Sequence, residues 1–153
     1  LAVVTLSLAQ VFVLLAVVRF GLGIQPSNSL GLLGFMALVS LVYAAILQLL
    51  NAALGVAGRL VALVLLMLQL TSSGGTYPIE VSPPFFQAIS PYLPMTYVVR
   101  GVRHLIGGGN ADVTIGAAAI LACFGIGAFA LTVLVATKQR RVRMKELKPE
   151  LSL

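Results

Sequence analysis

The chain has 153 residues, of which 59% are hydrophobic and only 9% are charged, and its mean hydropathy is +1.07. A soluble domain typically carries about 25% charged residues, so this composition excludes a water-facing globular domain and indicates an integral membrane protein. The single cysteine, Cys123, excludes a disulfide framework and a cysteine metal site.

Four apolar segments are predicted to cross the membrane, because a transmembrane helix needs about 20 apolar residues. These spans cover residues 1–24, 29–50, 54–70 and 113–137. Residues 25–28 form a polar turn between the first two spans, and Asn51, Gly55 and Gly58 mark the next turn. The chain begins with Leu1, and nothing there resembles a signal peptide, so we expect further residues upstream.

Segment 71–109 is too broken by proline and glycine for one helix, yet too apolar for an ordinary loop in water. We expect Gly74 and Gly75 to end the third helix in a left-handed turn, and Pro78 to prevent its continuation. Ser82, followed by Pro83 and Pro84, is predicted to cap a new helix that ends near residue 90.

A second short helix is predicted over residues 97–106. Pro91 and Pro94 precede it, Thr96 is its expected N-cap, and glycines 107–109 end it. Helices of about 7–11 residues are roughly 10–16 Å long, too short to cross the bilayer. We favour a helix pair over 76–107 that re-enters the outer leaflet and leans on the spans. A pair lying flat on the outer surface is the alternative.

The distribution of Lys and Arg predicts the topology. Six of the ten basic residues fall in the tail, residues 138–153. With this tail in the cytoplasm, seven basic residues lie inside and three outside, as the positive-inside rule prefers. A basic tail beside a span is typical of contact with membrane lipids, so we expect no nucleic-acid partner.

Several polar residues interrupt the apolar pattern. Arg19 and Arg59 lie near the ends of spans, where we favour anchoring by snorkelling over a polar path. Tyr97, Arg100, Gly101 and His104 share one face of a short helix, beside Arg103, and we expect them to face headgroups. Contact with an anionic substrate or lipid head is the alternative. The amides of Gln10, Gln48 and Gln69 are predicted to be buried and to bond between helices or line a path.

Small residues form a stripe in the last span: Gly116, Ala119, Cys123 and Gly127 recur at helical spacing. Such stripes allow helices to approach closely. We favour packing within the chain over a dimer seam.

No enzyme site, cofactor or metal is expected. The chain has no phosphate-binding loop of the Gly-x4-Gly-Lys type, and His104 is its only histidine. Glu80 and Asp112 are the only acids outside the tail, so no catalytic carboxylate pair is available.

The stretches LQLTSSGGTYPIE and PPFFQAISPYLPMTYVVRGVRHLIGGG closely resemble the C-terminal membrane domain of the YhgE/Pip family. That family includes the phage infection protein group and relatives linked to type VII secretion, within the ABC-2 type transporter superfamily. The resemblance covers roughly residues 20–137 and rests mainly on SSGGTYP and SPYLPMTY. It implies an all-α ABC-2 type membrane domain over residues 1–137, in the bacterial plasma membrane, holding the last four of the family's six spans.

The resemblance also implies a function. We expect a permease-like component of an export system, paired as a homodimer or heterodimer and driven by a separate ATP-binding-cassette subunit. The alternative is a non-transporting anchor or receptor that carries a large extracellular domain and serves phage adsorption or type VII secretion. The implied gate residues are Gly74, Gly75, Pro78, Pro83, Pro84, Pro91, Pro94, Thr96, Tyr97, Arg100 and Gly101.

Overall fold

The computed structural model describes residues 2–21, 23 and 26–146, and within them every regular element is a helix. The elements are α1 (Ala2–Ala16), the π-helical turn η1 (Val17–Gly21), α2 (Ser29–Leu54), α3 (Val56–Ser72), the 3-10 turn η2 (Ile79–Val81), α4 (Pro84–Ile89), the 3-10 turn η3 (Ser90–Tyr92), α5 (Pro94–Gly107) and α6 (Ala111–Glu146).

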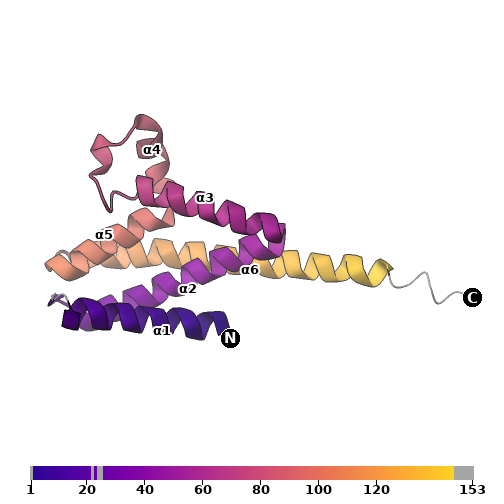
Figure 1. Cartoon of the computed structure of the whole chain (residues 1–153), viewed down its shortest axis with the longest axis horizontal. Coiled ribbons are helices and arrows are strands. Elements are labelled where there is room, and N and C mark those ends of the chain that lie inside the picture. Colours follow the sequence, from indigo (N-terminus) through magenta and orange to yellow (C-terminus); the bar gives the residue numbers. More distant parts are fainter. Residues whose placement is uncertain (1, 22, 24–25, 147–153) are drawn as a thin grey trace, which may run out of the picture.

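The long helices lie roughly along one axis and form a bundle with two distinct ends (Figure 1). At one end α1 and η1 finish, α2 and α6 begin, and α5 finishes; we call it the Ser27 end. At the other, which we call the Gly55 end, α2 turns into α3, and the described end of α6 extends beyond it. Helices α1, α2, α3 and α6 therefore run alternately up and down, as expected for successive membrane spans, whereas α5 runs in the same direction as α3.

Three helices are long and apolar enough to cross a membrane within the described residues: Val4–Gly21, Ser29–Leu54 and Ala111–Lys138. Val56–Ser72 is also apolar but has only 17 residues, about 26 Å at helical rise. The helical content and these apolar lengths confirm the prediction of an all-α membrane protein.

Local signals explain where the helices begin and end. The Asn28 side chain accepts a hydrogen bond of 2.8 Å from the Gly31 amide and so caps α2. The turn predicted at Asn51 was placed too early, because α2 continues through it to Leu54. The chain turns instead at Gly55, whose φ of +57° is a conformation that other residues rarely adopt.

The last helix is longer than the predicted span. The backbone of α6 remains helical to Glu146, nine residues past the predicted boundary at 137. The rest of the basic tail, residues 147–153 with Lys148, lies outside the described residues, as do residues 1, 22, 24 and 25.

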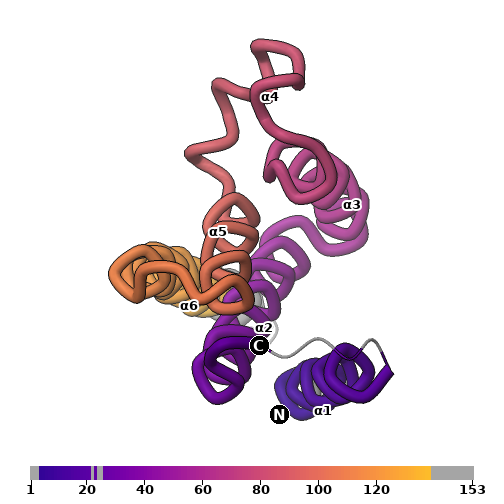
Figure 2. The backbone as a smooth tube through the Cα atoms, turned by 90° about the vertical axis from the view of Figure 1, so that its left-hand side faces the viewer, coloured from indigo at the N-terminus to yellow at the C-terminus, as the bar shows by residue number. Residues whose placement is uncertain are grey.

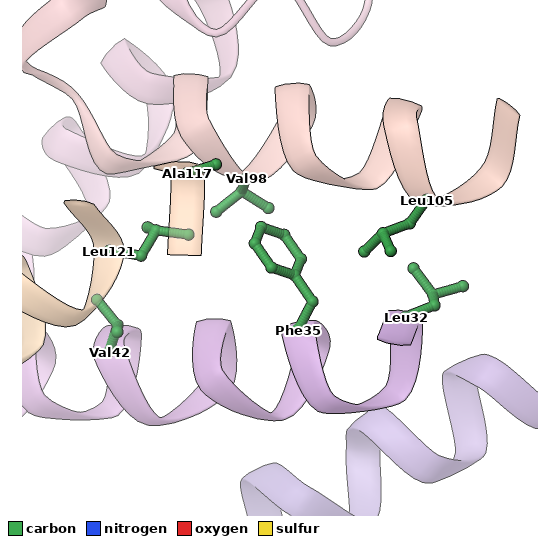
Figure 3. Close-up of a cluster of buried hydrophobic side chains, with 7 residues drawn as sticks. All are labelled: Leu32, Phe35, Val42, Val98, Leu105, Ala117 and Leu121. Carbon is green, nitrogen blue, oxygen red and sulfur yellow. The ribbon is translucent and has the colours of Figure 1, made fainter. Parts of the chain in front are cut away.

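Helix α2 is the centre of the bundle, and α1, α3, α5 and α6 all pack against it (Figure 2). Side chains of α2, α5 and α6 form the core, drawn in Figure 3: Leu32, Phe35, Val42, Val98, Leu105, Ala117 and Leu121. Short α5 is therefore a member of the bundle and not a surface appendage.

A glycine allows α5 to approach α2 closely. A Cβ atom added at Gly101 would lie 2.3 Å from Cζ of Phe35, so the ring occupies the space that any other residue would need. The prediction that Gly101 shares a polar face with Tyr97, Arg100 and His104 was wrong, since Gly101 is buried against this ring. Helical spacing predicts which residues share one face of a helix. It does not predict how much of the helix surface is covered by neighbouring helices.

We predict that Gly101→Val destabilises the protein by about 1–3 kcal/mol, the usual cost of overpacking a close contact. The matched control is Gly116→Val, because no atom lies within 4 Å of a Cβ at Gly116. The measurement is the fraction of monodisperse protein that survives heating in detergent. Equal heat resistance of the two variants would contradict the assigned contact, and adding Phe35→Ala to Gly101→Val should restore stability.

Candidate functional site

The segment between α3 and α5 lies beside the bundle, part-way along it, and not beyond its end (Figure 1). Gly74, with a φ of +67°, turns the chain just after α3 ends at Ser72, as predicted. Residues 73–93, which we call the lateral lobe, then pass through η2, α4 and η3 and project away from α1 and α2 (Figure 2). The three prolines Pro78, Pro83 and Pro84 all lie in this lobe.

The two predicted short helices have different environments. Helix α4 contacts α3 and has no buried residue, whereas α5 packs on both α2 and α6. Helix α4 begins at Pro84, with Pro83 and not Ser82 at its N-cap. The lobe exposes aromatic rings, among them Tyr77, Phe85 and Tyr92.

Helix α5 begins part-way along the bundle and runs outward to the Ser27 end. Near its start, Val98 lies beside Ala117 and Leu121, which are six and ten residues into α6 (Figure 3), or about 9–15 Å along that helix. At its far end, the Ser27 hydroxyl donates a 3.3 Å hydrogen bond to the carbonyl of Ile106. Its start therefore lies well inside the length of the bundle.

Hydrogen bonds clamp the SPYLPMTY turn, which joins η3 to α5. The Thr96 hydroxyl donates to the Ser90 carbonyl at 2.7 Å, and the two hydroxyls are 3.1 Å apart. The Tyr97 hydroxyl donates to the Pro91 carbonyl, also at 2.7 Å. Both carbonyls belong to η3, and the Ser90 carbonyl also accepts from the Leu93 amide, so the two hydroxyls add bonds that tie the start of α5 back to this turn.

The prediction that Thr96 is the N-cap of this helix was wrong. Helix α5 starts three residues earlier than predicted, at Pro94, with Leu93 in the capping position. Proline is favoured at the first helical position because its fixed φ suits the helix and its missing amide has no partner there anyway. Thr96 is thereby free to bond back to Ser90.

A second set of contacts joins α5 to the end of α3. The Arg103 guanidinium donates a 2.6 Å hydrogen bond to the Gly74 carbonyl. A Cβ atom at Gly75 would lie 3.3 Å from Val99 Cγ2, so this glycine lets the lobe pass close to α5. A cation at a helix C-terminus is also favoured by the helix dipole. Both motifs therefore meet at α5: SPYLPMTY contains the start of this helix, and SSGGTYP contacts its later residues.

The remaining predicted residues are dispersed. Arg59 is exposed at the Gly55 end, while Arg19, in the π-helical turn, donates to the Ser29 hydroxyl at 3.3 Å. His104 folds over Gly109, since a Cβ there would lie 2.0 Å from its Nδ1. The two ends of the bundle therefore carry separate arginines, with no shared polar path among these side chains.

One buried polar contact joins α2 and α3. Gln69, only 2% exposed, accepts a hydrogen bond through Oε1 from the Tyr43 hydroxyl, which also lies 3.4 Å from Met95 Sδ. The prediction of a buried inter-helix amide is met by Gln69 alone, because Gln10 and Gln48 are exposed in this chain. Sequence reasoning missed Tyr43, which only the packing of α2 on α3 reveals.

A groove of about 690 Å³ lies between α2, α3 and α6, with η3 and the start of α5 at its rim. It follows α6 from Ala119 to Leu131, about 18 Å at helical rise. Its lining residues are Ile46, Leu49, Leu65, Gln69, Tyr92, Leu93, Pro94, Ala119, Ile120, Cys123, Phe124, Gly127, Ala128 and Leu131. The wall is almost wholly apolar and bears no charged side chain.

The predicted packing role of the small-residue stripe was wrong. Gly116, Ala119, Cys123 and Gly127 are all exposed, and the last three line the groove. The face of α6 that packs inside the chain is the one with Ala117, Leu121 and Ala128. The stripe is therefore available for contacts outside this chain.

No group of three or more His, Cys, Asp or Glu that could hold a metal ion occurs among the described residues.

We predict that Thr96→Val loosens the turn, because the Ser90 carbonyl loses its hydroxyl donor and keeps only the Leu93 amide, at a net cost of about 0.5–1.5 kcal/mol. Hydrogen exchange of the amides of residues 90–97 should accelerate about two- to tenfold. The control is Thr132→Val, whose hydroxyl bonds only to Ala128 of its own helix. Unchanged exchange in Thr96→Val would show that the clamp does not hold the turn.

Comparison with known proteins identifies the family of this chain. The family described as ABC-2 family transporter protein matches residues 1–134. The chain is 35% identical over 129 residues to "Uncharacterized protein YhgE" of Bacillus subtilis (strain 168). That alignment covers 80% of this chain but only 17% of the relative, so the chain spans less than a fifth of its length. No solved structure matches significantly. The family match and this identity together show that the chain belongs to the ABC-2 transporter family and is of the YhgE type.

Proposed function

We propose that this chain is a permease-like component of an export system of the bacterial plasma membrane. Membership of the ABC-2 transporter family supports a membrane component of this kind. The observation that carries the proposal is the apolar groove with η3 and the start of α5 at its rim. An export path needs a wall and a closure. In this proposal the groove is the wall, and η3 with the start of α5 is the closure.

The groove would form half of the path, and a second ABC-2 subunit, identical or different, would form the other half. Ala119, Cys123 and Gly127 give α6 an exposed surface of small side chains along the groove. Small residues let two helices approach closely in a membrane. The exposed lateral lobe supports the same arrangement, because irregular backbone within a membrane has to be covered by protein or face water.

The clamped turn would act as the outer gate. Pro91 and Pro94 interrupt the helix on either side of Leu93, so the chain can bend there without breaking a regular helix. Closed, the turn keeps the bonds of Thr96 and Tyr97. Opening would exchange these few bonds for others, a local change that a hinge of this size can absorb.

Energy would come from a separate ATP-binding-cassette subunit, because the chain contains no phosphate-binding loop. We place that subunit at the Gly55 end. The α2–α3 turn with Arg59 lies there, and so does the described end of α6, which contains the first part of the basic tail. The excess of Lys and Arg on this side supports a cytoplasmic C-terminus, with four spans when α3 is counted.

A second candidate function follows from the length of the relative. More than four fifths of the Bacillus subtilis protein lies outside the aligned region. If this protein carries a comparable extra domain outside the cell, its membrane part would serve as the anchor of a receptor or of a secretion accessory protein. In that case the clamped turn would be a fixed structural element.

The two candidates differ in their response to ATP and to the prolines. We predict that the purified protein, reconstituted with its ATP-binding-cassette partner, stimulates ATP hydrolysis, and that Pro91→Ala/Pro94→Ala abolishes the stimulation without preventing insertion. The double variant should do so because alanine lets η3 and α5 continue as one helix. The matched control is Pro26→Ala, in the turn at the Ser27 end. Full stimulation in the double variant, or none in the wild type, would favour the anchor.

The assigned sidedness gives a separate prediction. In a Cys123→Ala background, Thr76→Cys should react with an impermeant maleimide added to intact cells, and Lys138→Cys should react only after the membrane is opened. Both positions are exposed in the structure, so burial in the chain does not limit the reaction. The reverse pattern of labelling would invert the topology.

A further inference from the structure

The exposed face of α5 carries a cation that the described part of the protein leaves without an acidic partner. The Arg100 guanidinium lies over the Tyr97 ring, 5.9 Å from its centroid. No ion pair joins it to Glu80 or Asp112, the only acids among the described side chains. Its neighbours on the helix are committed, since Tyr97 bonds to Pro91 and Arg103 to Gly74.

The backbone of Arg100 lies about 5–6 Å below the boundary between hydrocarbon and headgroups. Helix α2 has 26 residues, about 39 Å, and so extends about 4–5 Å beyond each side of a hydrocarbon layer of about 30 Å. Arg100 lies seven residues before the end of α5 at Gly107, about 10 Å from the Ser27 end. Its side chain can therefore reach the phosphate level by snorkelling.

The surroundings favour an amphipathic anion. His104 lies one turn beyond Arg100 on the same helix, at the spacing that makes helix side chains neighbours. Large apolar side chains exposed on the lobe and on the first turns of α6 include Phe85 and Ile115, and they lie among polar ones such as Glu80. A ligand that places a phosphate on the cation and acyl chains against these side chains matches both features.

We propose that Arg100 and His104 of α5 bind the phosphate of an anionic phospholipid headgroup, while the Tyr97 ring lies against the Arg100 guanidinium. The planar guanidinium presents paired N–H donors that match phosphate oxygens. The bound lipid would cover the polar face of α5 and fix its distance from the membrane surface. This inference is independent of export, because an anchor would need the same contact.

Native mass spectrometry tests the proposal. The purified protein is equilibrated in detergent with equal amounts of dioleoylphosphatidylglycerol and dioleoylphosphatidylcholine, which share their acyl chains. We expect the wild type to retain the anionic lipid preferentially, and Arg100→Gln to lower this preference about fivefold, the equivalent of roughly 1 kcal/mol per basic residue at an anionic surface. Absence of a preference in the wild type would overturn the proposal.

The matched control is Arg19→Gln, which removes the same charge from the same end of the bundle. Unlike Arg100, the Arg19 side chain is bonded to Ser29. We expect this variant to retain the lipid preference of the wild type. An equal loss of preference in both variants would attribute the effect to general surface charge and overturn the proposed site. If Arg100→Gln does not fold, His104→Gln is compared instead, where a lowered preference supports the site and an unchanged one overturns it. Displacement of the lipid by excess inorganic phosphate would identify a small-anion site and overturn the lipid assignment.

Discussion

The contact between the Phe35 ring and Gly101 holds α5 inside the bundle, and the other features of the site depend on it. With α5 packed between α2 and α6, its first residues meet the groove, and its exposed face turns toward the lateral lobe. A larger residue at position 101 would push the helix outward. The turn that begins it would then leave the groove, and the bonds to Ser90, Pro91 and Gly74 would lose their partners.

Several turns and helix ends could be predicted from sequence, but the buried faces of the helices could not. Gly74 marks the end of α3, and Pro84 the start of α4, because their backbone preferences act locally, whereas the start of α5 was predicted three residues too late. Which face of α6 is buried depends on the neighbour that it meets. In a membrane this cannot be inferred from hydropathy, since lipid-facing and protein-facing side chains are equally apolar. The small residues of α6 were therefore assigned to the wrong surface.

A few polar contacts in this protein join segments that are distant in the chain, although most of its side-chain hydrogen bonds are local. Arg103 bonds across 29 positions to Gly74, and Tyr43 across 26 to Gln69. Each donor supplies a hydrogen bond to an acceptor in an apolar setting. An unsatisfied polar group there costs roughly several kcal/mol. Sequence reasoning identified Gln69 and Arg103 as unusual residues, but their partners became evident only from the packing of the helices.

Helix α6 is much longer than a membrane is thick. Its 36 residues extend about 54 Å, whereas the hydrocarbon layer is about 30 Å. Its last turns therefore stand in the aqueous phase as a continuous extension of the helix that lines the groove. Because one continuous helix forms both parts, a tilt imposed on the protruding end would also move the wall of the groove.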